Sequence, residues 1–238
     1  MAGHTDVVRR EHLNRDRVLR TAVALADEAG VDAVSMRKLA QRLGVVPMAL
    51  YKHVANKDEL LDGMVDAVVA EIDPPDARLS WQAAVRRRIL SAREVLLRHP
   101  WARRVMESKT APTPVVLAYM DSTIAMFLAG GLSVDLTHHV MHALGSRIFG
   151  FTQELYDNAP RADPDLQAAM ARHLADTYPN IVAIATSRPH DPGTVVGSGC
   201  DDQFEFEFGL DLLLAGVERL HRQGWSSSDR SRGSSAAV

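Results

Sequence analysis

The sequence predicts an all-α protein, in which an N-terminal three-helix domain with a helix-turn-helix precedes a larger helical C-terminal domain. Two observations predict this fold class. Apolar residues recur at the i, i+3, i+4 and i+7 spacing of an amphipathic helix in nearly every long segment. Gly and Pro residues stand between those segments, where helices begin or end. The chain of 238 residues is long enough to bury a sizeable core.

The N-terminal domain is expected at residues 13–73. A first helix carries the apolar stripe of Leu19, Ala22, Val23 and Ala26 and ends at Gly30. Further helices are expected at Met36–Leu43 between the cap Ser35 and the stop Gly44, at residues 47–54 with Pro47 in the first turn, and at residues 57–72 behind the capping box of Asn56 and Glu59. Pro74 and Pro75 mark the boundary of the domain.

The C-terminal domain is expected at residues 76–224, and its predicted elements are again helices. They cover residues 81–98, 101–107, 112–128, 134–156, 163–177 and 206–220. Phe204, Phe206 and Phe208 alternate like a strand, but the longer helical period favours a helix there. Residues 187–203 read as a mobile loop rich in Gly, Pro and Ser. The tails, 1–12 and 226–238, are expected to be disordered.

Composition restricts the compartment and the chemistry. The single cysteine, Cys200, excludes a disulfide framework within the chain and a Cys₄ zinc site, and it fits a reducing cytoplasm. We expect it to be an inert thiol rather than a redox sensor. No apolar run approaches 18 residues and no signal-peptide core precedes the first helix, so a cytoplasmic protein without a membrane span is expected.

Basic side chains gather in the predicted helix-turn-helix. Between Ser35 and Lys57 there are five basic and no acidic residues, although the whole chain carries a net charge of −3. Such a patch suits a phosphate backbone, and the alternative is a solvated helix face. A second cluster reads mainly as solvated surface with ion-pair partners rather than a second binding face: Arg86, Arg87, Arg88, Arg93, Arg98, Arg103 and Arg104.

The short helix that follows Gly44 has the composition of a DNA-reading element. Leu50 and Val54 are spaced to face the core, which leaves Pro47, Met48, Ala49, Tyr51 and Lys52 outward. Tyr51 and Lys52 suit phosphates, and Met48 or Ala49 suits a thymine methyl group. Ser35, Asn56 and Lys57 stand at helix N-termini, where backbone N–H groups bind phosphate. The alternative is a plain helical hairpin with a basic rim.

Four motifs stand out in residues 13–65: A-x-x-L-x-x-E-x-G at 22–30, SMRKLAQRLGV at 35–45, L-Y-x-H-V at 50–54 and NKDELL at 56–61. Through these motifs, the segment resembles the DNA-binding domain of the TetR family of transcriptional repressors. The later chain resembles, more weakly, the regulatory domain of the tetracycline-repressor branch, through Ser80-Trp81-Gln82 and Phe208-Gly209-Leu210.

The resemblance implies a homodimer on double-stranded DNA with a palindromic operator. It implies that Arg37 reaches a base edge, that Tyr51, His53 and Lys57 contact phosphates, and that Lys52 adds a further contact. Met36, Pro47, Met48 and Ala49 replace other residues at the family's DNA-reading positions, so a different operator sequence is expected. The full set of implied DNA contacts is Ser35, Met36, Arg37, Pro47, Met48, Ala49, Tyr51, Lys52, His53 and Lys57.

The resemblance also implies dimerisation through residues 134–156, in part, and 205–220, packed as a four-helix bundle. A small molecule that enters the regulatory domain would displace the fourth helix and release the DNA. The coupling between the effector pocket and the DNA-binding helices, called the reading head below, would then run through four residues of the fourth helix: Asp58, Leu60, Leu61 and Met64.

The effector is not identified by the resemblance. At the positions that hold tetracycline and magnesium in the tetracycline repressor stand Asp73, Met106, Arg88, Ala92 and Glu154, and only the Glu is retained. Tetracycline with Mg²⁺ is therefore not expected, and no cofactor or metal is assigned. The candidate pocket residues, which ordinary core packing explains equally well, are Arg88, Ala92, Met106, Met126, Phe127, His138, Met141, His142, Phe149 and Glu154. Methionine-rich linings suit adaptable apolar ligands.

Two alternatives remain beside these expectations. His138 and His142 stand at i and i+4, but buried core or pocket histidines are favoured over a metal pair. An all-helical enzyme or small-molecule carrier, with an incidental basic N-terminal domain, is the rival function. The sequence lacks the G-x-S-x-G and phosphate-loop motifs, and an enzyme has no need of an acid-free basic helix-turn-helix. The chain is thus expected not to be an enzyme.

Overall fold

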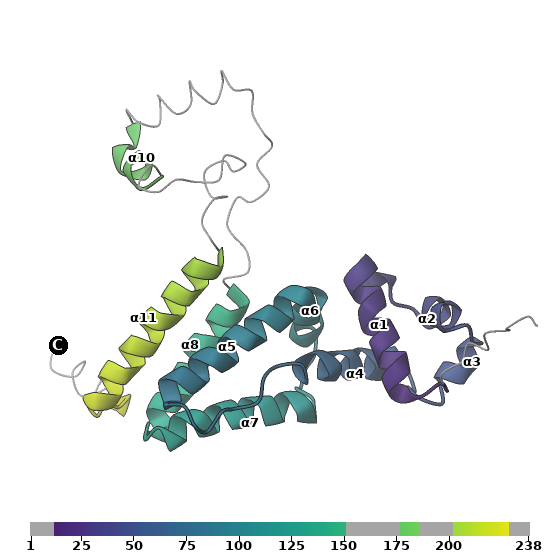
Figure 1. Ribbon diagram of the computed structural model, residues 1–238, viewed down its shortest axis with the longest axis horizontal. Helices are drawn as coiled ribbons and strands as arrows, with labels where there is room; N and C mark the ends of the chain where they lie inside the picture. Colours follow the sequence, from purple (N-terminus) through teal and green to yellow (C-terminus); the bar gives the residue numbers. More distant parts are fainter. Residues whose placement is uncertain (1–11, 151–176, 186–201, 229–238) are drawn as a thin grey trace, which may run out of the picture. The chain divides into compact units, whose positions relative to one another are not determined.

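The computed structural model describes residues 12–150, 177–185 and 202–228, and every regular element in these ranges is a helix (Figure 1). This confirms the expected all-α fold class. The chain divides into two compact units, Met1–Leu132 with α1 to α7 and Ser133–Val238 with α8, α10 and α11. The expected domain limits at 73 and 76 fall inside the first unit and stay a prediction. No helix in the described ranges is long and apolar enough to cross a membrane.

Helix α1, Arg15–Ala29, begins at a side-chain cap and ends at a glycine. The Asn14 Oδ1 accepts the Arg17 N–H at 2.8 Å, and Gly30 follows the helix with φ +78°. Three members of the expected stripe are buried, Leu19, Ala22 and Ala26, and the fourth, Val23, is half-buried against the same core. A short 3₁₀ turn, η1 at Val31–Ala33, leads to the next helix.

Helix α2, Met36–Leu43, has the limits that its flanking residues predict. The Ser35 Oγ accepts the Lys38 N–H at 3.3 Å, which satisfies one donor of the first turn. Gly44 ends the helix in the left-handed region, at φ +68°, and its N–H reaches the carbonyls of Ala40 and Gln41. A residue without a Cβ takes this conformation at no steric cost.

Helix α3, Pro47–Leu50, is shorter than the expected 47–54. After Leu50 the chain continues as turns, in which the His53 N–H reaches the Leu50 carbonyl at 2.8 Å in the tighter i→i−3 pattern. Leu50 and Val54 are both fully buried, as their spacing predicts. The turn lets both side chains enter the core within a very short element.

Helix α4, Lys57–Val69, ends before the expected Ile72. Its start follows the expected capping pattern: the Asn56 Oδ1 accepts the Glu59 N–H at 2.8 Å, and the Glu59 Oε2 accepts the Ala55 N–H at 2.7 Å. Beyond Val69 the last bonds tighten to i→i−3. Pro74 disfavours the helical conformation for the preceding residue, Asp73, so the helix has to end before that residue.

Helix α4 lies between the N-terminal helices and those that follow. It packs on α1 and also on α5 (Trp81–Arg98), α6 (Trp101–Glu107) and α7 (Pro114–Ala129). The approach to α1 is very close, because a Cβ added at Gly63 would lie 2.7 Å from a methyl carbon of Leu19. One core runs through α1 to α4 and includes Val95, Trp101 and Val105.

A polar cluster links α1 to the α5–α6 corner. The Asp27 Oδ1 accepts the Trp101 Nε1–H at 2.7 Å and lies 2.8 Å from the His99 Nδ1. His99 also approaches Glu71 at 3.3 Å. At the surface nearby, Arg104 donates to Asp32 at 2.8 and 3.0 Å. These contacts bind the first helix to the start of the predicted regulatory domain.

In the second unit, α8 (Val134–Gly150) packs against α11 (Asp202–Arg222), and α10 covers Pro179–Ala185. Leu136, Val140 and Leu144 are buried on α8, and Phe206, Leu210, Leu214 and Val217 are buried on α11. The helical interpretation of the three alternating phenylalanines is confirmed, with an earlier start at Asp202. Residues 151–156, the helix expected at 163–177 except its last residue, and Cys200 lie outside the described residues.

The chain after α11 returns to the start of α8. Asp135 accepts the Ser227 N–H and Oγ–H, both at 2.7 Å, and the Ser226 Oγ–H at 3.1 Å. These hydrogen bonds hold the pKa of Asp135 below its usual value. The first residues of the segment that we expected to be a disordered tail are therefore placed, and residues 229–238 lie outside the described part.

The Asp27 cluster supplies a stability prediction. In Asp27→Ala, the buried Trp101 Nε1–H loses its acceptor, so the free energy of unfolding should fall by about 1–3 kcal/mol. Urea denaturation measures this change. The matched control is Asp32→Ala, which breaks an exposed pair with Arg104 and should cost less than about 1 kcal/mol. Equal losses in the two variants would contradict the special role of Asp27.

Candidate nucleic-acid interface and regulatory site

The helix-turn-helix presents most of the predicted DNA-contacting side chains to solvent. Ser35, Arg37, Pro47, Met48, Tyr51, Lys52 and Lys57 are exposed, and Met36, Ala49 and His53 are half-buried. Met36 also packs against the core, so only part of its side chain is free for another contact. The structure places the ten residues on α2 and its cap, on α3 and the turn that follows it, and at the start of α4.

Large apolar side chains on α3 and directly before it are exposed to solvent. Met48 is 72% exposed and Val46, directly before the helix, is 68% exposed. Sequence reasoning included Met48 and missed Val46, although its place before Pro47, in the turn between two helices, was a usable signal. In a major groove, exposed apolar side chains can contact the methyl group of thymine, while basic side chains beside them contact phosphates.

The positive charge of this face is smaller than the residue count indicates. The Arg42 guanidinium donates to both carboxylate oxygens of Glu28 on α1, and the hydrogen bond raises the pKa of Arg42 and lowers that of Glu28. Among the described residues, Arg37, Lys38, Lys52 and Lys57 have no ion-pair partner. Four of the five basic side chains are thus available to an external anion.

The second arginine cluster divides into two groups. Four of its exposed or half-buried members pair with carboxylates, as expected for solvated surface: Arg87 with Asp73 and Asp76, Arg98 with Glu71, Arg103 with Glu107 and Arg104 with Asp32. The expectation is wrong for Arg88 and Arg93, which are only 6% and 4% exposed. Both lie on the face of α5 that also buries Val85, Ile89 and Ala92.

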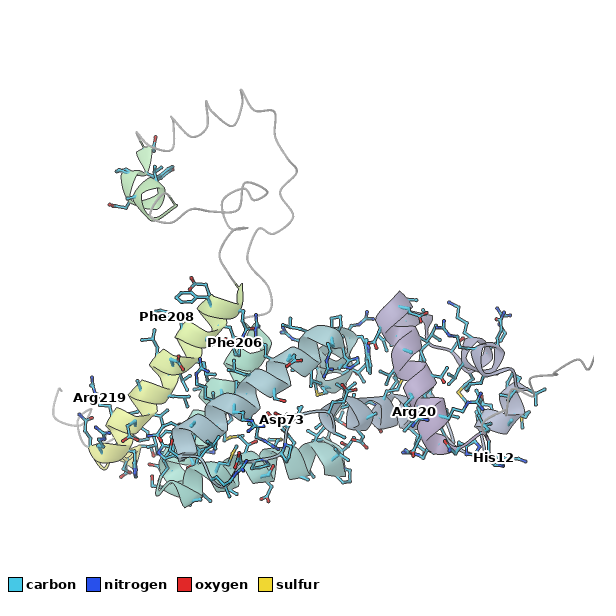
Figure 2. All side chains as sticks on the ribbon, in the orientation of Figure 1. His12, Arg20, Asp73, Phe206, Phe208 and Arg219 are labelled. Carbon is cyan, nitrogen blue, oxygen red and sulfur yellow. The ribbon has the colours of Figure 1, made fainter. Side chains whose placement is uncertain are left out.

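Arg88 is held inside the first unit by neutral groups. Its Nη1 donates to the Asp73 carbonyl at 2.8 Å, its Nη2 to the Ser122 Oγ at 2.8 Å and its Nε to the Thr123 Oγ1 at 3.2 Å. The guanidinium carbon also lies 4.5 Å from the centre of the Tyr119 ring. Figure 2 marks Asp73 in the connection between α4 and α5.

The other predicted pocket residues are distributed over both units. Ala92, Met126 and Phe127 are buried on α5 and α7, and Phe127 lies 5.8 Å from the Trp81 ring. Met106 on α6 is half-buried and packs against the core of α1 to α4. Met141 is half-buried on α8. The Phe149 side chain and Glu154 lie outside the described residues.

The histidines of α8 are not core residues. His138 and His142 are exposed, with ring centres 4.7 Å apart, which corrects the expectation of core histidines, while their place in an effector pocket stays a prediction. Within the described ranges, no group of three or more His, Cys, Asp or Glu is placed to hold a metal ion. The i, i+4 spacing put the two rings on one face, but nothing in the local pattern determined what covers that face.

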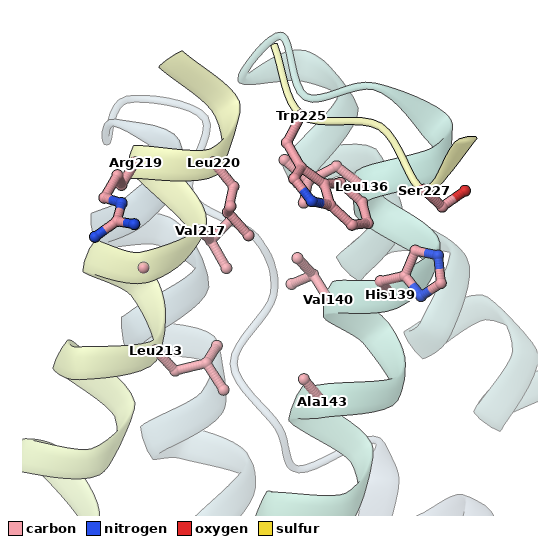
Figure 3. Close-up of a pocket in the computed structure, with 11 residues that line it drawn as sticks. Leu136, His139, Val140, Ala143, Leu213, Val217, Arg219, Leu220, Trp225 and Ser227 are labelled. Atoms are coloured by element: carbon pink, nitrogen blue, oxygen red, sulfur yellow. The ribbon is translucent and has the colours of Figure 1, made fainter. Parts of the chain in front are cut away.

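An apolar cavity of about 620 Å³ lies between α8 and α11 (Figure 3). Leu136, Val140 and Ala143 line it from α8, and Leu213, Val217 and Leu220 line it from α11. Trp225 and Ser227, from the chain after α11, line one end. Of the predicted effector residues whose side chains the structure describes, none lines this cavity. The sequence feature that could have indicated the cavity is the apolar stripe on each of the two helices. By the family resemblance, these helices are interpreted as the dimer interface.

Helix α4 is tied along its length to the helices that follow it. Lys109 pairs with Asp62 at 2.7 Å and with Asp58 at 3.6 Å, and the hydrogen bond to Asp62 raises the pKa of Lys109. Farther along, Thr113 donates to Asp66. Leu60 and Met64, two of the predicted joint residues, are fully buried, and Leu61 is half-buried.

Known proteins share both parts of this architecture. Residues 18–64 match the family model of bacterial regulatory proteins of the tetR family, and residues 73–221 match the tetracyclin repressor-like C-terminal domain. A HTH-type transcriptional regulator of Saccharopolyspora erythraea is 31% identical over 206 residues, which cover 86% of this chain and 84% of the relative.

A second relative and a solved structure are similar to this chain over most of its length. The class D tetracycline repressor protein of Escherichia coli is 41% identical over 209 residues, 87% of this chain and 89% of the relative. The crystal structure of ActR from Streptomyces coelicolor in complex with actinorhodin, at 28% identity, covers 87% of this chain and 98% of that chain with a TM-score of 0.64. The chain therefore belongs to the TetR family, as a transcriptional repressor with a helix-turn-helix DNA-binding domain, and it is not an enzyme.

Proposed function

We propose that this repressor binds a palindromic operator as a homodimer and is released from it by a small-molecule effector. The observation that carries the proposal is the surface of α2 and α3, where unpaired cations surround exposed apolar side chains on a very short helix. Such a surface has little use in a folded monomer, whereas it matches phosphates and base edges in a major groove. As a regulator of promoters, the protein acts in the cytoplasm.

The proposed DNA contacts divide into base reading and positioning. Arg37 offers a planar fork that suits the O6 and N7 of guanine, and Met48 and Ala49 suit a thymine methyl group. Tyr51, His53 and Lys57 contact phosphates, with Lys52 and the N-terminus of α2 at Ser35 as further phosphate sites. The bidentate pair of Arg42 with Glu28 fixes α2 against α1, so it orients the reading surface.

The homodimer is supported by apolar side chains that the second unit leaves exposed. On α11, Leu212 is 59% and Phe208 is 53% exposed, and the Phe204 and Phe208 rings stack with centres 6.4 Å apart. Leu213, the next residue after Leu212, lines the apolar cavity between α8 and α11. A second copy of α8 and α11 would complete a four-helix bundle and set two reading helices about 34 Å apart.

Effector release is supported by the position of α4. This helix carries the reading head at one end and contacts α5, α6 and α7 along its length. A ligand that binds better when α4 is displaced lowers operator affinity by that difference in binding free energy. ActR, a structural relative, has been solved with actinorhodin, and an organic molecule is the effector class that we infer here.

Operator binding is tested on the DNA around the gene itself. The protein should shift a palindromic fragment from its own promoter region, and its affinity should fall steeply as salt rises, because phosphate contacts release counterions. Fluorescence anisotropy across a salt series measures both effects. Equal affinity for this fragment and for bulk DNA at every salt concentration would contradict the proposal.

The role of Arg37 is separable from that of the phosphate contacts. Arg37→Ala should cost about 1–3 kcal/mol of operator binding and relax the preference at one base position. Lys57→Ala is the matched control, since it should weaken all sequences alike and lower the salt slope by about 1. Anisotropy on a set of single-base operator variants measures the difference. If Arg37→Ala weakened binding to every operator variant by the same factor, Arg37 would be a phosphate contact and not a base contact.

The proposed interface is tested by a charge on α11. Leu212→Glu would bury a carboxylate in the bundle, so it should yield monomers in size-exclusion chromatography with light scattering and should weaken operator binding. Leu97→Glu, at a leucine on α5 that is 51% exposed, is the control and should leave a dimer. A dimer in both variants would place the interface elsewhere.

A further inference from the structure

The buried Arg88 differs from every other arginine whose ion pairs the structure records. Arg87, its neighbour in sequence, is exposed and meets the carboxylates of Asp73 and Asp76. Arg88 is 6% exposed, and in the described part of the chain its acceptors are one carbonyl and two hydroxyl groups. Loss of solvent lowers the pKa of Arg88, the direction expected of a buried cation without a compensating anion.

The groups around Arg88 remain satisfied if the guanidinium turns to another partner. The Ser122 Oγ–H and the Thr123 Oγ1–H both donate to the Tyr119 carbonyl, at 2.9 and 2.8 Å. The two hydroxyl groups only accept hydrogen bonds from Arg88. If the guanidinium turned away, their own O–H groups would therefore keep the Tyr119 carbonyl as acceptor. An oxyanion that accepts two N–H bonds from the planar fork forms stronger bonds than these neutral acceptors do.

The surroundings specify the rest of the ligand. Ala92, Met126 and Phe127 are buried on the same two helices, α5 and α7, and Tyr119 places its ring over the guanidinium. These side chains suit an apolar or aromatic body and provide no second charge. An aromatic carboxylate combines the two properties that this part of the protein can bind.

The bond from Arg88 to Asp73 reaches the chain directly after α4. Asp73 is held there through its carbonyl by Arg88, through its N–H by the Ser91 Oγ at 2.9 Å, and through its carboxylate by Arg87 at 3.3 Å. The contacts from Arg88 and Ser91 are part-buried, whereas the one from Arg87 is exposed. An anion that takes the guanidinium therefore removes one of the fixed points of the segment that links α4 to α5.

We propose that Arg88 binds the carboxylate of an aromatic-acid effector, and that this exchange releases the Asp73 carbonyl and loosens the C-terminal end of α4. The proposal rests on the proposed function in that α4 carries the reading head. It goes further by naming the charge of the effector, the residue that recognises it and the bond that is given up.

The experiment compares naphthalene-2-carboxylate with naphthalene-2-carboxamide, which has nearly the same shape without the charge. Isothermal titration calorimetry on the full chain should give a Kd about tenfold or more lower for the carboxylate. Arg88→Gln should abolish this ratio, and Arg88→Lys should retain only part of it because the fork is lost. Arg87→Gln, next to it on the surface, should keep the full ratio.

A second variant guards against a purely structural effect of changing Arg88. Ser122→Ala removes one acceptor that competes for the guanidinium, so it should tighten carboxylate binding and leave carboxamide binding unchanged. If Arg88 only braced α5 against α7, this variant would not favour the carboxylate. Equal Kd values for the two compounds, no carboxylate binding at millimolar concentration, or an unchanged ratio in Arg88→Gln would each overturn the inference.

Operator binding keeps this failure separate from failure of the proposed function. The carboxylate should lower the affinity of the wild-type protein for its promoter fragment more than the carboxamide does, in the same anisotropy assay. A protein that binds the fragment specifically but ignores the carboxylate contradicts the role of Arg88 alone. A protein that never binds the fragment specifically contradicts the repressor mechanism, whatever the calorimetry gives.

Discussion

Helix α4 has to be packed from two directions at once, and the rest of the first unit is organised around that requirement. One face buries Leu60 and Met64 in the core shared with α1, and other contacts run to α5, α6 and α7. Polar contacts follow the same helix, from Lys109 near its start to Thr113 and Asp66 farther along. A helix buried in this way cannot shift without changing the packing of both neighbours, because interiors are close-packed.

The same constraint explains why the helices before and after α4 share a core. Trp101 is buried beside the residues of α1, and its indole N–H is satisfied by Asp27. A buried indole N–H without a partner is costly, so this contact specifies one arrangement of the α5–α6 corner against α1. Through the contact of Trp101 with Asp27, α6 is joined directly to α1 as well as indirectly through α4.

Local chemistry made much of this fold predictable. Ser35 and Gly44 determine α2 at both ends through a side-chain cap and a left-handed residue, and both signals lie within the sequence of the element. The length of α3 was not predictable in this way, because Leu50 and Val54 satisfy a helical spacing whether the chain between them is a helix or a turn. The exposed side chains of α3 followed from the same spacing, and the family resemblance agreed with them.

Long-range partners were the part that the sequence did not contain. Nothing in the arginine-rich stretch of α5 distinguished Arg88 from Arg87, since their fates depend on Ser122, Thr123 and Tyr119, more than 30 positions later. The pairing of Arg42 with Glu28 likewise reduced the charge that a residue count had assigned to DNA. The cavity of α8 and α11 arises only when two distant stripes meet.

The absent side chain at Gly63 has a mechanical consequence. Because Leu19 occupies the space beside that backbone, ridge and hollow interlock, and sliding of one helix along the other would drive methyl groups into the main chain. If α4 moves as proposed, α1 would therefore have to move with it. The helices that carry the proposed DNA contacts would then be displaced together with α4.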